Sequence, residues 1–277
     1  MSLQKLAQRA AVLAVAACAP LAVLAAPAHA QPAPGFSHVA VGERSALLSL
    51  PAGYDPALSY PVLLVFGGLG ASAEDMAATA GLHHGTNAIV AYARGLNNTW
   101  AGAPYSAASM GDDIAYARGI VDSIAAHHLV DRSRVYAVGH SNGGAFAEAL
   151  ACRAPDLVAG VASVSGMFYE GVDANCVGSP VPVLLMHAAN DDVAVPVGGV
   201  RHGTRFEPTQ EILGRWNHRN GCQPVPAPRW TSAPFAVATT GVGCRAETDF
   251  IISASAGHQW PSYASGEAWN FLSRQAR

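Results

Sequence analysis

A serine bracketed by glycines stands where an apolar run gives way to a helix-prone segment. Residues 136–150 read YAVGHSNGGAFAEAL, which places Gly139 and Gly143 two positions before and after Ser141. A G-x-S-x-G pentapeptide between a strand and a helix is typical of a nucleophilic serine on a tight turn. Larger side chains at the two glycine positions would collide with the neighbouring strand and helix. An ordinary serine at a glycine-rich helix start is the alternative, and the flanking elements favour the nucleophile.

A serine hydroxyl is a weak nucleophile unless a base takes its proton and an acid orients that base. In a strand–turn–helix setting of this kind the partners follow in the order serine, acid, histidine. Asp191 and Asp192 come directly after a long apolar run, and His258 lies in the later loop GHQWP. The eleven histidines show no spacing typical of a metal site, and the predicted chemistry needs no metal or organic cofactor.

Acyl transfer also needs hydrogen-bond donors for the oxyanion that develops in the transition state. One donor is expected to be the backbone N–H of Asn142, and the second that of Leu69 in the loop GGLG after another apolar run. This loop lacks the full G-x-G-x-x-G spacing of a dinucleotide-binding turn. Trp100 and Trp260 are the candidates for an apolar substrate-binding surface.

The elements that must position these residues follow from the apolar pattern. Strands are predicted at 46–50, 61–66, 88–92, 134–138, 157–164, 181–187 and 248–252, and helices at 112–127, 142–152, 208–219 and 266–274. Several of the strand runs are continuous rather than alternating, as in strands buried on both faces. The alternation predicts an α/β fold with a mostly parallel central sheet and helices on both faces. Ligand sites in such sheets lie at the carboxyl ends of the strands.

The first thirty residues have the pattern of a cleaved secretory signal peptide. Lys5 and Arg9 precede an Ala/Leu/Val stretch that ends in the small-x-small sequence at 28–30. A transmembrane anchor and lipoprotein processing at Cys18 are the alternatives. We therefore expect a single catalytic domain over 31–277 that is secreted or periplasmic, with no membrane attachment once the signal is removed.

Export changes how the remaining cysteines are interpreted. Cys152, Cys176, Cys222 and Cys244 follow the predicted signal, and four cysteines in an exported chain predict two disulfides. Sequence proximity favours the pairs 152–176 and 222–244, and buried free thiols are the alternative. No C-x-x-C pair exists that would indicate zinc.

The charge balance argues against a nucleic-acid partner, because the formal net charge is −3. Lys5 is the only lysine, so the chain has no Gly-Lys-Ser/Thr phosphate-binding loop. The second half is relatively rich in arginine, at positions Arg201, Arg205, Arg215, Arg219, Arg229 and Arg245. These arginines form either a positive rim that attracts an anionic substrate or an ordinary solvated surface.

Together these segments resemble the α/β-hydrolases of the polyhydroxybutyrate-depolymerase and feruloyl-esterase type. The resemblance rests on VYAVGHSNGG, LACRAPDLVAGVASVSG, HAANDD, RWNHRNGC and GHQWP in this order. It implies an α/β-hydrolase fold with Ser141 as nucleophile, His258 as base and, by the family spacing, Asp191 as acid, with Asp192 as the alternative. The oxyanion loop departs from the family's usual His-Gly, since Gly67-Gly68 stands there.

The sequence thus predicts an exported serine hydrolase that cleaves small or oligomeric carboxylic esters, such as hydroxyacid oligomers or feruloyl esters. One alternative is an amide hydrolase acting on a polyanion such as poly(aspartic acid), which some relatives cleave. Another is a catalytically inactive hydrolase fold used for binding. The sequence does not indicate an oligomeric state.

Overall fold

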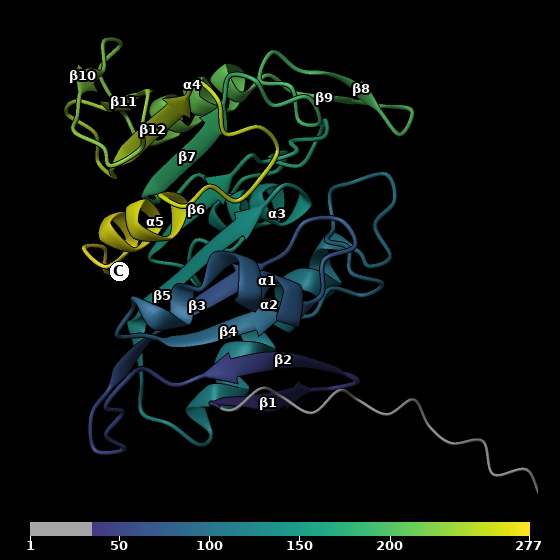
Figure 1. The fold of residues 1–277 in the computed structure, drawn as a ribbon, viewed down its shortest axis with the longest axis vertical. Coiled ribbons are helices and arrows are strands. Elements are labelled where there is room, and N and C mark those ends of the chain that lie inside the picture. The colour runs from purple at the N-terminus through teal and green to yellow at the C-terminus, as the bar shows by residue number, and fades with distance from the viewer. Residues whose placement is uncertain (1–34) are drawn as a thin grey trace, which may run out of the picture. The chain divides into compact units, whose positions relative to one another are not determined.

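A ten-stranded sheet runs through residues 35–277, the part of the chain that the computed structural model describes (Figure 1). In order across the sheet the strands are β1 (Phe36–Val41), β2 (Arg44–Ser49), β4 (Ile89–Ala93), β3 (Tyr60–Phe66), β5 (Val130–His140), β6 (Gly160–Val164), β7 (Val183–Ala188), β12 (Thr248–Ser253), β11 (Ala236–Thr240) and β10 (Ala227–Pro228). The strands from β4 to β12 are parallel, and antiparallel strands extend both edges. This is the mostly parallel sheet that the sequence predicts.

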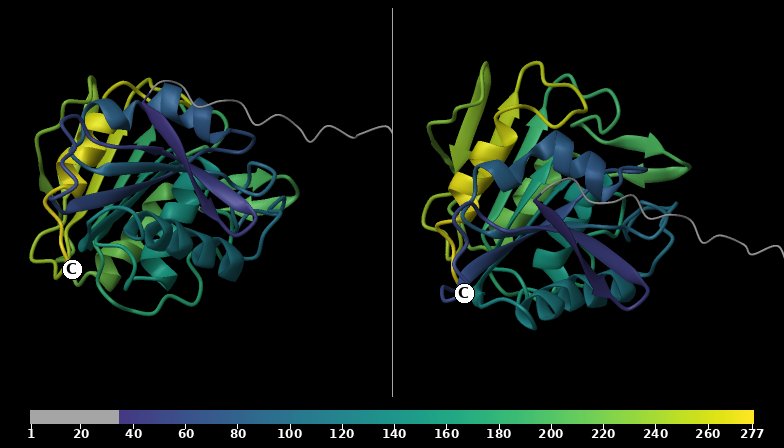
Figure 2. Two further views of the ribbon diagram at one scale, coloured as in Figure 1. Left: turned by 90° about the horizontal axis from the view of Figure 1, so that it is seen from below. Right: turned by 60° about the horizontal axis from the view of Figure 1, so that its bottom comes forward.

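In the described part of the chain, five α-helices cover the two faces of the sheet (Figures 1 and 2). One face carries α1 (Ala73–Ala80) and α5 (Ala264–Leu272), and the other carries α2 (Met110–Ala125), α3 (Asn142–Arg153) and α4 (Thr209–Arg219). A short 3-10 helix, η1 (Leu82–His84), follows α1. Each helix presents an apolar stripe to the sheet, so the molecule has two hydrophobic layers with the sheet between them.

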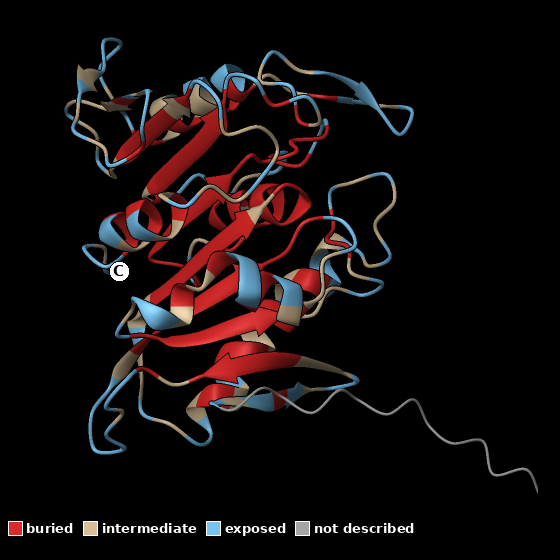
Figure 3. Cartoon of the chain, in the orientation of Figure 1, coloured by how far each residue is buried: buried red, intermediate tan, exposed pale blue. Residues whose placement is uncertain are grey.

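The central strands are buried on both faces, which explains their continuous apolar sequences. In β3, Leu63 and Val65 pack beneath α1 and α5, whereas Leu64 and Phe66 point into the opposite layer. Figure 3 shows the same strands as the most buried part of the sheet. Successive side chains of a strand point to opposite faces, so a strand between two helical layers needs apolar residues at every position.

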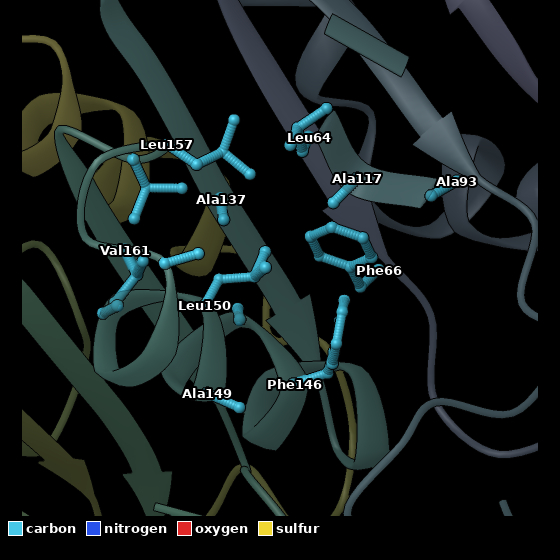
Figure 4. Packing of buried hydrophobic residues seen from close by; sticks show 14 of the residues in the cluster. Leu64, Phe66, Ala93, Ala117, Ala137, Phe146, Ala149, Leu150, Leu157 and Val161 are labelled. Atoms are coloured by element: carbon cyan, nitrogen blue, oxygen red, sulfur yellow. The ribbon is translucent and has the colours of Figure 1, made fainter. Parts of the chain in front are cut away.

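The core beneath α3 fixes the helix that follows Ser141. Phe146 of α3 packs edge-to-face on Phe66 of β3, with ring centroids 5.0 Å apart. Leu150, one turn further along α3, is also fully buried, and Figure 4 shows both side chains in the cluster between α3 and the sheet. The start of α3 is therefore held against the carboxyl ends of β3 and β5.

The structure confirms the seven predicted strands and four predicted helices, with boundaries that differ by a few residues. Sequence reasoning missed β1, α1, β10, β11 and a separate hairpin of β8 (Gly199–Arg201) and β9 (Thr204–Phe206). The missed elements are short or exposed, which makes their apolar periodicity weak. The predicted signal peptide lies outside the described residues.

Both predicted disulfides are present, as Cys152–Cys176 and Cys222–Cys244. The first joins the carboxyl end of α3 to the loop before β7. The second closes a loop between α4 and β12. Within residues 35–277, the helices are too short or too polar to cross a bilayer.

Candidate active site

Ser141 occupies a backbone conformation that only a tightly constrained turn imposes, with φ 53° and ψ −119°. The turn is possible because glycines flank it. A Cβ at Gly139 would lie 2.1 Å from the Gly143 carbonyl oxygen, and one at Gly143 would lie 2.3 Å from that of Phe66. Both distances are far inside van der Waals contact, so the predicted steric reason for the two glycines is confirmed.

The turn is anchored to the neighbouring strand ends by its own backbone. The Ser141 N–H donates to Val164 O at 2.9 Å, and the Ser141 carbonyl accepts from the Met167 N–H at 3.0 Å. The residue is only 8% exposed, at the start of α3. Its hydroxyl therefore has a fixed position above the carboxyl ends of β5 and β6.

The structure brings the predicted serine, histidine and aspartate into one hydrogen-bonded chain. His258 Nε2 lies 2.9 Å from Ser141 Oγ, and His258 Nδ1 lies 2.9 Å from Asp191 Oδ2. These three residues are 50 or more positions apart in sequence and reach one another from the ends of β5, β7 and β12. In this arrangement the imidazole can receive the serine proton on Nε2 while Nδ1–H donates to the carboxylate.

Asp191 is buried and accepts several hydrogen bonds. Its Oδ1 accepts from the N–H groups of Val193 at 2.9 Å and Ala194 at 2.8 Å. Burial alone raises the pKa of Asp191, but hydrogen bonds from His187 and His258 outweigh it and hold that pKa well below the usual range. Asp191 is therefore a carboxylate at neutral pH. Asp192, the alternative acid, is exposed to solvent, so the geometry selects Asp191.

His187 is a second imidazole on Asp191, a role that sequence reasoning did not assign. Its buried ring places Nε2 3.2 Å from Asp191 Oδ2 and 2.7 Å from Ala194 O. Nδ1 lies 3.0 Å from Thr209 Oγ1. Two acceptors around Nε2 require the proton there, so Nδ1 accepts from the threonine hydroxyl. The available signal was a histidine four residues before the acid at the end of a buried strand.

The loop between β3 and α1 approaches the nucleophile closely, as the predicted oxyanion role of Leu69 requires. A Cβ at Gly68 would lie 3.3 Å from Ser141 Cβ. Among residues 35–277, the backbone N–H groups of Leu69 and Asn142 donate to no other backbone group. The Asn142 N–H belongs to the first turn of α3, where amides lack partners within the helix.

Trp100 corrects one sequence prediction, because it does not face a substrate. It is 2% exposed, and its indole Nε1–H donates to Gly67 O at 3.0 Å. Its backbone N–H donates to Asn142 Oδ1 at 2.7 Å, and Asn142 Nδ2 donates back to Trp100 O at 3.0 Å. Trp100 thus ties the oxyanion loop to the first residue of α3. The sequence analysis singled out Trp100 correctly but placed it on the cleft surface, whereas it is buried behind that surface.

A cleft of about 420 Å³ opens above Ser141. Its lining residues are Gly68, Leu69, Ala71, Tyr105, His140, Ser141, Met167, Tyr169, Val193, Arg201, His202 and His258. Trp260, the second predicted binding residue, is not among them; its indole N–H donates to Ser265 Oγ on α5. Burial, reinforced by His258, lowers the pKa of His140 to about 4, so this ring is neutral at neutral pH.

Of the two interpretations of the six arginines, the structure supports balance by nearby acids for three of them. Arg215 and Arg219 pair with Asp173, and Arg229 pairs with Asp249 and Glu267. These cations are neutralised within the fold. Arg245 donates to the Arg219 carbonyl, and of the six arginines only Arg201 lines the cleft.

The sheet order, the glycine-bracketed turn and the serine–histidine–aspartate chain define the protein as an α/β-hydrolase. A family model described as "Putative esterase" matches residues 37–176, half of the sequence. The chain belongs to this esterase family, and it is a carboxylic-ester hydrolase.

Two relatives and one solved structure show the range of similarity. Feruloyl esterase C of Emericella nidulans is 27% identical over 260 residues, covering 84% of each chain. "Putative esterase NocK" of Nocardia uniformis is 36% identical over 137 residues, covering 47% of this chain and 40% of that protein. The acetyl xylan esterase of Aspergillus awamori superposes with a TM-score of 0.66 at 13% identity, covering 86% of this chain and 98% of that one. The last shares the fold.

Proposed function

We propose that this protein is an exported serine esterase that forms an acyl-enzyme on Ser141. The observation that carries the proposal is the hydrogen-bonded chain from Ser141 Oγ through His258 to Asp191, with 2.9 Å at each step. His258 takes the serine proton as Oγ attacks the ester carbonyl, then gives it to the departing alcohol. It then takes a proton from the water that attacks the acyl-enzyme and gives that proton to Ser141 Oγ as the acyl–oxygen bond breaks, which releases the acid and restores the serine.

The oxyanion that forms on the carbonyl oxygen accepts from the N–H groups of Asn142 and Leu69. Trp100 supports both segments, because it donates to the Asn142 side chain and to the Gly67 carbonyl in the loop that carries Leu69. Preorganised donors of this kind stabilise the transition state because no reorganisation is needed when charge develops. Removing one such donor typically lowers kcat by about 10²–10³-fold.

We propose hydroxycinnamoyl-type esters as the first substrates to test, followed by hydroxyacid oligomers. The cleft is lined by Tyr105, Tyr169 and Met167, which suit an aromatic or extended acyl group. A relative over most of this chain is named as a feruloyl esterase. An amide hydrolase acting on a polyanion is the second candidate, supported by the single cation at the cleft, Arg201.

The test is turnover of methyl ferulate and 4-nitrophenyl acetate by the purified chain and by Ser141→Ala. We expect the wild type to release acid from at least one ester and the variant to lose at least 10³-fold in kcat. A folded wild type that hydrolyses neither, or a variant with undiminished turnover, would contradict the proposal. Export rests on the two disulfides and the N-terminal pattern, and predicts a secreted protein that begins at Gln31 by mass spectrometry.

A further inference from the structure

Arg201 is a cation without an acidic partner that lines the same cleft as Ser141. It lines the cleft above Ser141, and none of the twelve lining residues is an aspartate or glutamate. Within residues 35–277 its guanidinium forms no ion pair, unlike those of Arg215 and Arg219. A cation without a partner at the mouth of a reaction cleft attracts anions because the protein supplies no competing carboxylate.

The hairpin that carries Arg201 projects from the body of the molecule, as Figure 1 shows for β8 and β9, and backbone hydrogen bonds attach it. A two-residue turn joins its strands, in which His202 and Gly203 have φ of 51° and 73°, as a tight β-hairpin requires. The Glu170 N–H donates to Arg205 O at 3.0 Å, and the Glu207 N–H donates to Phe168 O at 2.7 Å.

These bonds attach the hairpin to the segment that follows β6. The same segment holds the nucleophile, because the Met167 N–H donates to the Ser141 carbonyl at 3.0 Å. A short path of backbone hydrogen bonds therefore connects the turn around Ser141 to the hairpin that carries Arg201.

Two tyrosines, Tyr105 and Tyr169, line the same cleft as Arg201. The Tyr105 ring packs edge-on against Tyr169, with centroids 5.9 Å apart, and against His202 at 5.0 Å. Burial raises the pKa of both tyrosine hydroxyls, whereas the nearby Arg201 charge acts to lower it. Both hydroxyls are therefore protonated at neutral pH, and both lie in the cleft that Arg201 lines.

We propose that Arg201, at the cleft that Tyr105 and Tyr169 also line, forms a subsite for a carboxylate on the acyl or alcohol part of the ester. This subsite gives the enzyme a preference for anionic esters over neutral ones of the same shape. The planar guanidinium can hold a carboxylate through two hydrogen bonds. The inference rests on the proposed function, since it assigns a substrate class to the Ser141 site.

The experiment compares anionic and neutral esters in two matched pairs. The mono-4-nitrophenyl ester of adipic acid against 4-nitrophenyl hexanoate tests a carboxylate on the acyl side. A comparison of 4-acetoxybenzoic acid with its methyl ester, followed by loss of the acetyl group, tests a carboxylate on the alcohol side. For each pair we measure the ratio of kcat/KM values, anionic over neutral. In at least one pair we expect Arg201→Gln to lower this ratio about five- to ten-fold, the range for a partly exposed charged hydrogen bond.

Arg205→Gln is the matched control, because Arg205 lies on the other strand of the same hairpin and outside the cleft lining. It removes the same charge from the protein and should leave both ratios unchanged. Arg201→Glu is a second variant and should lower the ratio further by repulsion. The wild-type preference should also weaken as salt rises, since the guanidinium faces solvent.

Two outcomes would overturn the subsite. One is a set of ratios that Arg201→Gln and Arg201→Glu leave unchanged; the other is an equal fall in Arg205→Gln. Either result, obtained with a wild type that hydrolyses the neutral esters, leaves the proposed function standing. A folded wild type that hydrolyses none of the four esters would instead contradict the proposed function and the subsite together.

Discussion

The carboxylate of Asp191 determines which nitrogen of His258 carries the proton. It lies 2.9 Å from Nδ1 and leaves Nε2 free to face Ser141. Two backbone N–H groups and the His187 ring also bond the Asp191 carboxylate and fix its orientation. A catalytic imidazole in the wrong tautomer cannot accept the serine proton, so this small cluster controls the whole reaction.

Asp191→Asn is expected to lower kcat about 10³–10⁴-fold with little change in KM. An amide NH₂ in place of the carboxylate favours the imidazole tautomer that presents Nε2–H to the serine, and it no longer stabilises the imidazolium. Asp192→Asn is the matched control, because Asp192 is adjacent and exposed, and its kcat should stay within about twofold of wild type. Steady-state kinetics on one ester measure kcat for both variants. An equal loss of kcat in the two variants would contradict the assignment of Asp191 as the acid.

At the scale of elements, the first turn of α3 and the loop after β3 work as one unit. Trp100 reaches Gly67 O with its indole and exchanges two hydrogen bonds with the Asn142 side chain. The Leu69 amide follows directly from the strand end that Trp100 secures. The geometry of the oxyanion site therefore depends on a residue that contacts no substrate.

Trp100→Phe is predicted to lower kcat about tenfold and to destabilise the fold by about 1–2 kcal/mol. Phenylalanine keeps most of the packing but leaves the buried Gly67 carbonyl without its donor. Trp269→Phe, on α5 at the other face of the sheet, is the control and should change stability without a comparable loss of kcat. Kinetics and urea unfolding on both variants test this; a Trp100→Phe enzyme with wild-type kcat would show that the clamp is dispensable.

Helix α3 also carries a buried acid, Glu148, whose Oε1 accepts from the Trp216 indole at 2.7 Å. Burial, assisted by the negative charge of Asp173, raises its pKa to about 8. In the unfolded chain a glutamate has a pKa of about 4.3, so between that pH and about 8 the folded state holds a proton that the unfolded state has lost. Stability contributed by the neutral carboxyl is therefore present at low pH and declines as pH rises through this window.

Glu148→Gln should remove this pH dependence, because the amide has no proton to lose. The quantity to compare is the free energy of unfolding of the variant minus that of the wild type. We expect this difference to be larger at about pH 8 than at about pH 5. Urea unfolding at both pH values measures it, with the exposed Glu170→Gln as control. A wild type and variant that differ by the same amount at both pH values would contradict the neutral carboxyl.

At the scale of the whole molecule, two disulfides close loops of similar size, with sequence separations of 24 and 22 residues. The Cys152–Cys176 bond secures the far end of α3, the helix that Ser141 begins. Cross-links of this loop size stabilise a fold mainly by restricting the unfolded chain, by about 3 kcal/mol each.

Replacing Cys152 and Cys176 together by alanine should therefore lower the free energy of unfolding by about 3 kcal/mol. The matched variant at Cys222 and Cys244 should lose a similar amount, because its loop is nearly as long. Urea unfolding without reductant measures both losses. Midpoints that coincide with the wild type would show that neither bond contributes to stability.

The central sheet and the hydrogen-bonded chain were predictable because strong local signals specify them. Continuous apolar runs marked β3, β5 and β7, and the glycines around Ser141 left one steric explanation. The short helix α1 was missed although Ser72 and Asp75 form a capping box at its start, because eight alanine-rich residues show little periodicity. The β8–β9 hairpin was missed because its strands have three residues each.

Other features depend on tertiary position, which sequence patterns do not contain. Asp191 and Asp192 are chemically identical neighbours, and only the fold buries one and exposes the other. The sequence analysis placed Trp100 in the cleft, but the side chain is buried in the core. An apolar side chain suits either position, so its residue type does not tell them apart. The ion pairs of Arg215 and Arg229 join segments that are distant in sequence. A count of arginines in the second half of the chain therefore overstates the positive charge available to a substrate.

The most direct measurement of the central claim is the site of covalent labelling by a fluorophosphonate, located by mass spectrometry of the digested protein. We predict one adduct, on Ser141, that is absent in Ser141→Ala and formed at least 10²-fold more slowly in His258→Ala, because the hydroxyl then lacks its base. A folded wild type that stays unlabelled, or that carries the adduct on a different residue, would contradict the account.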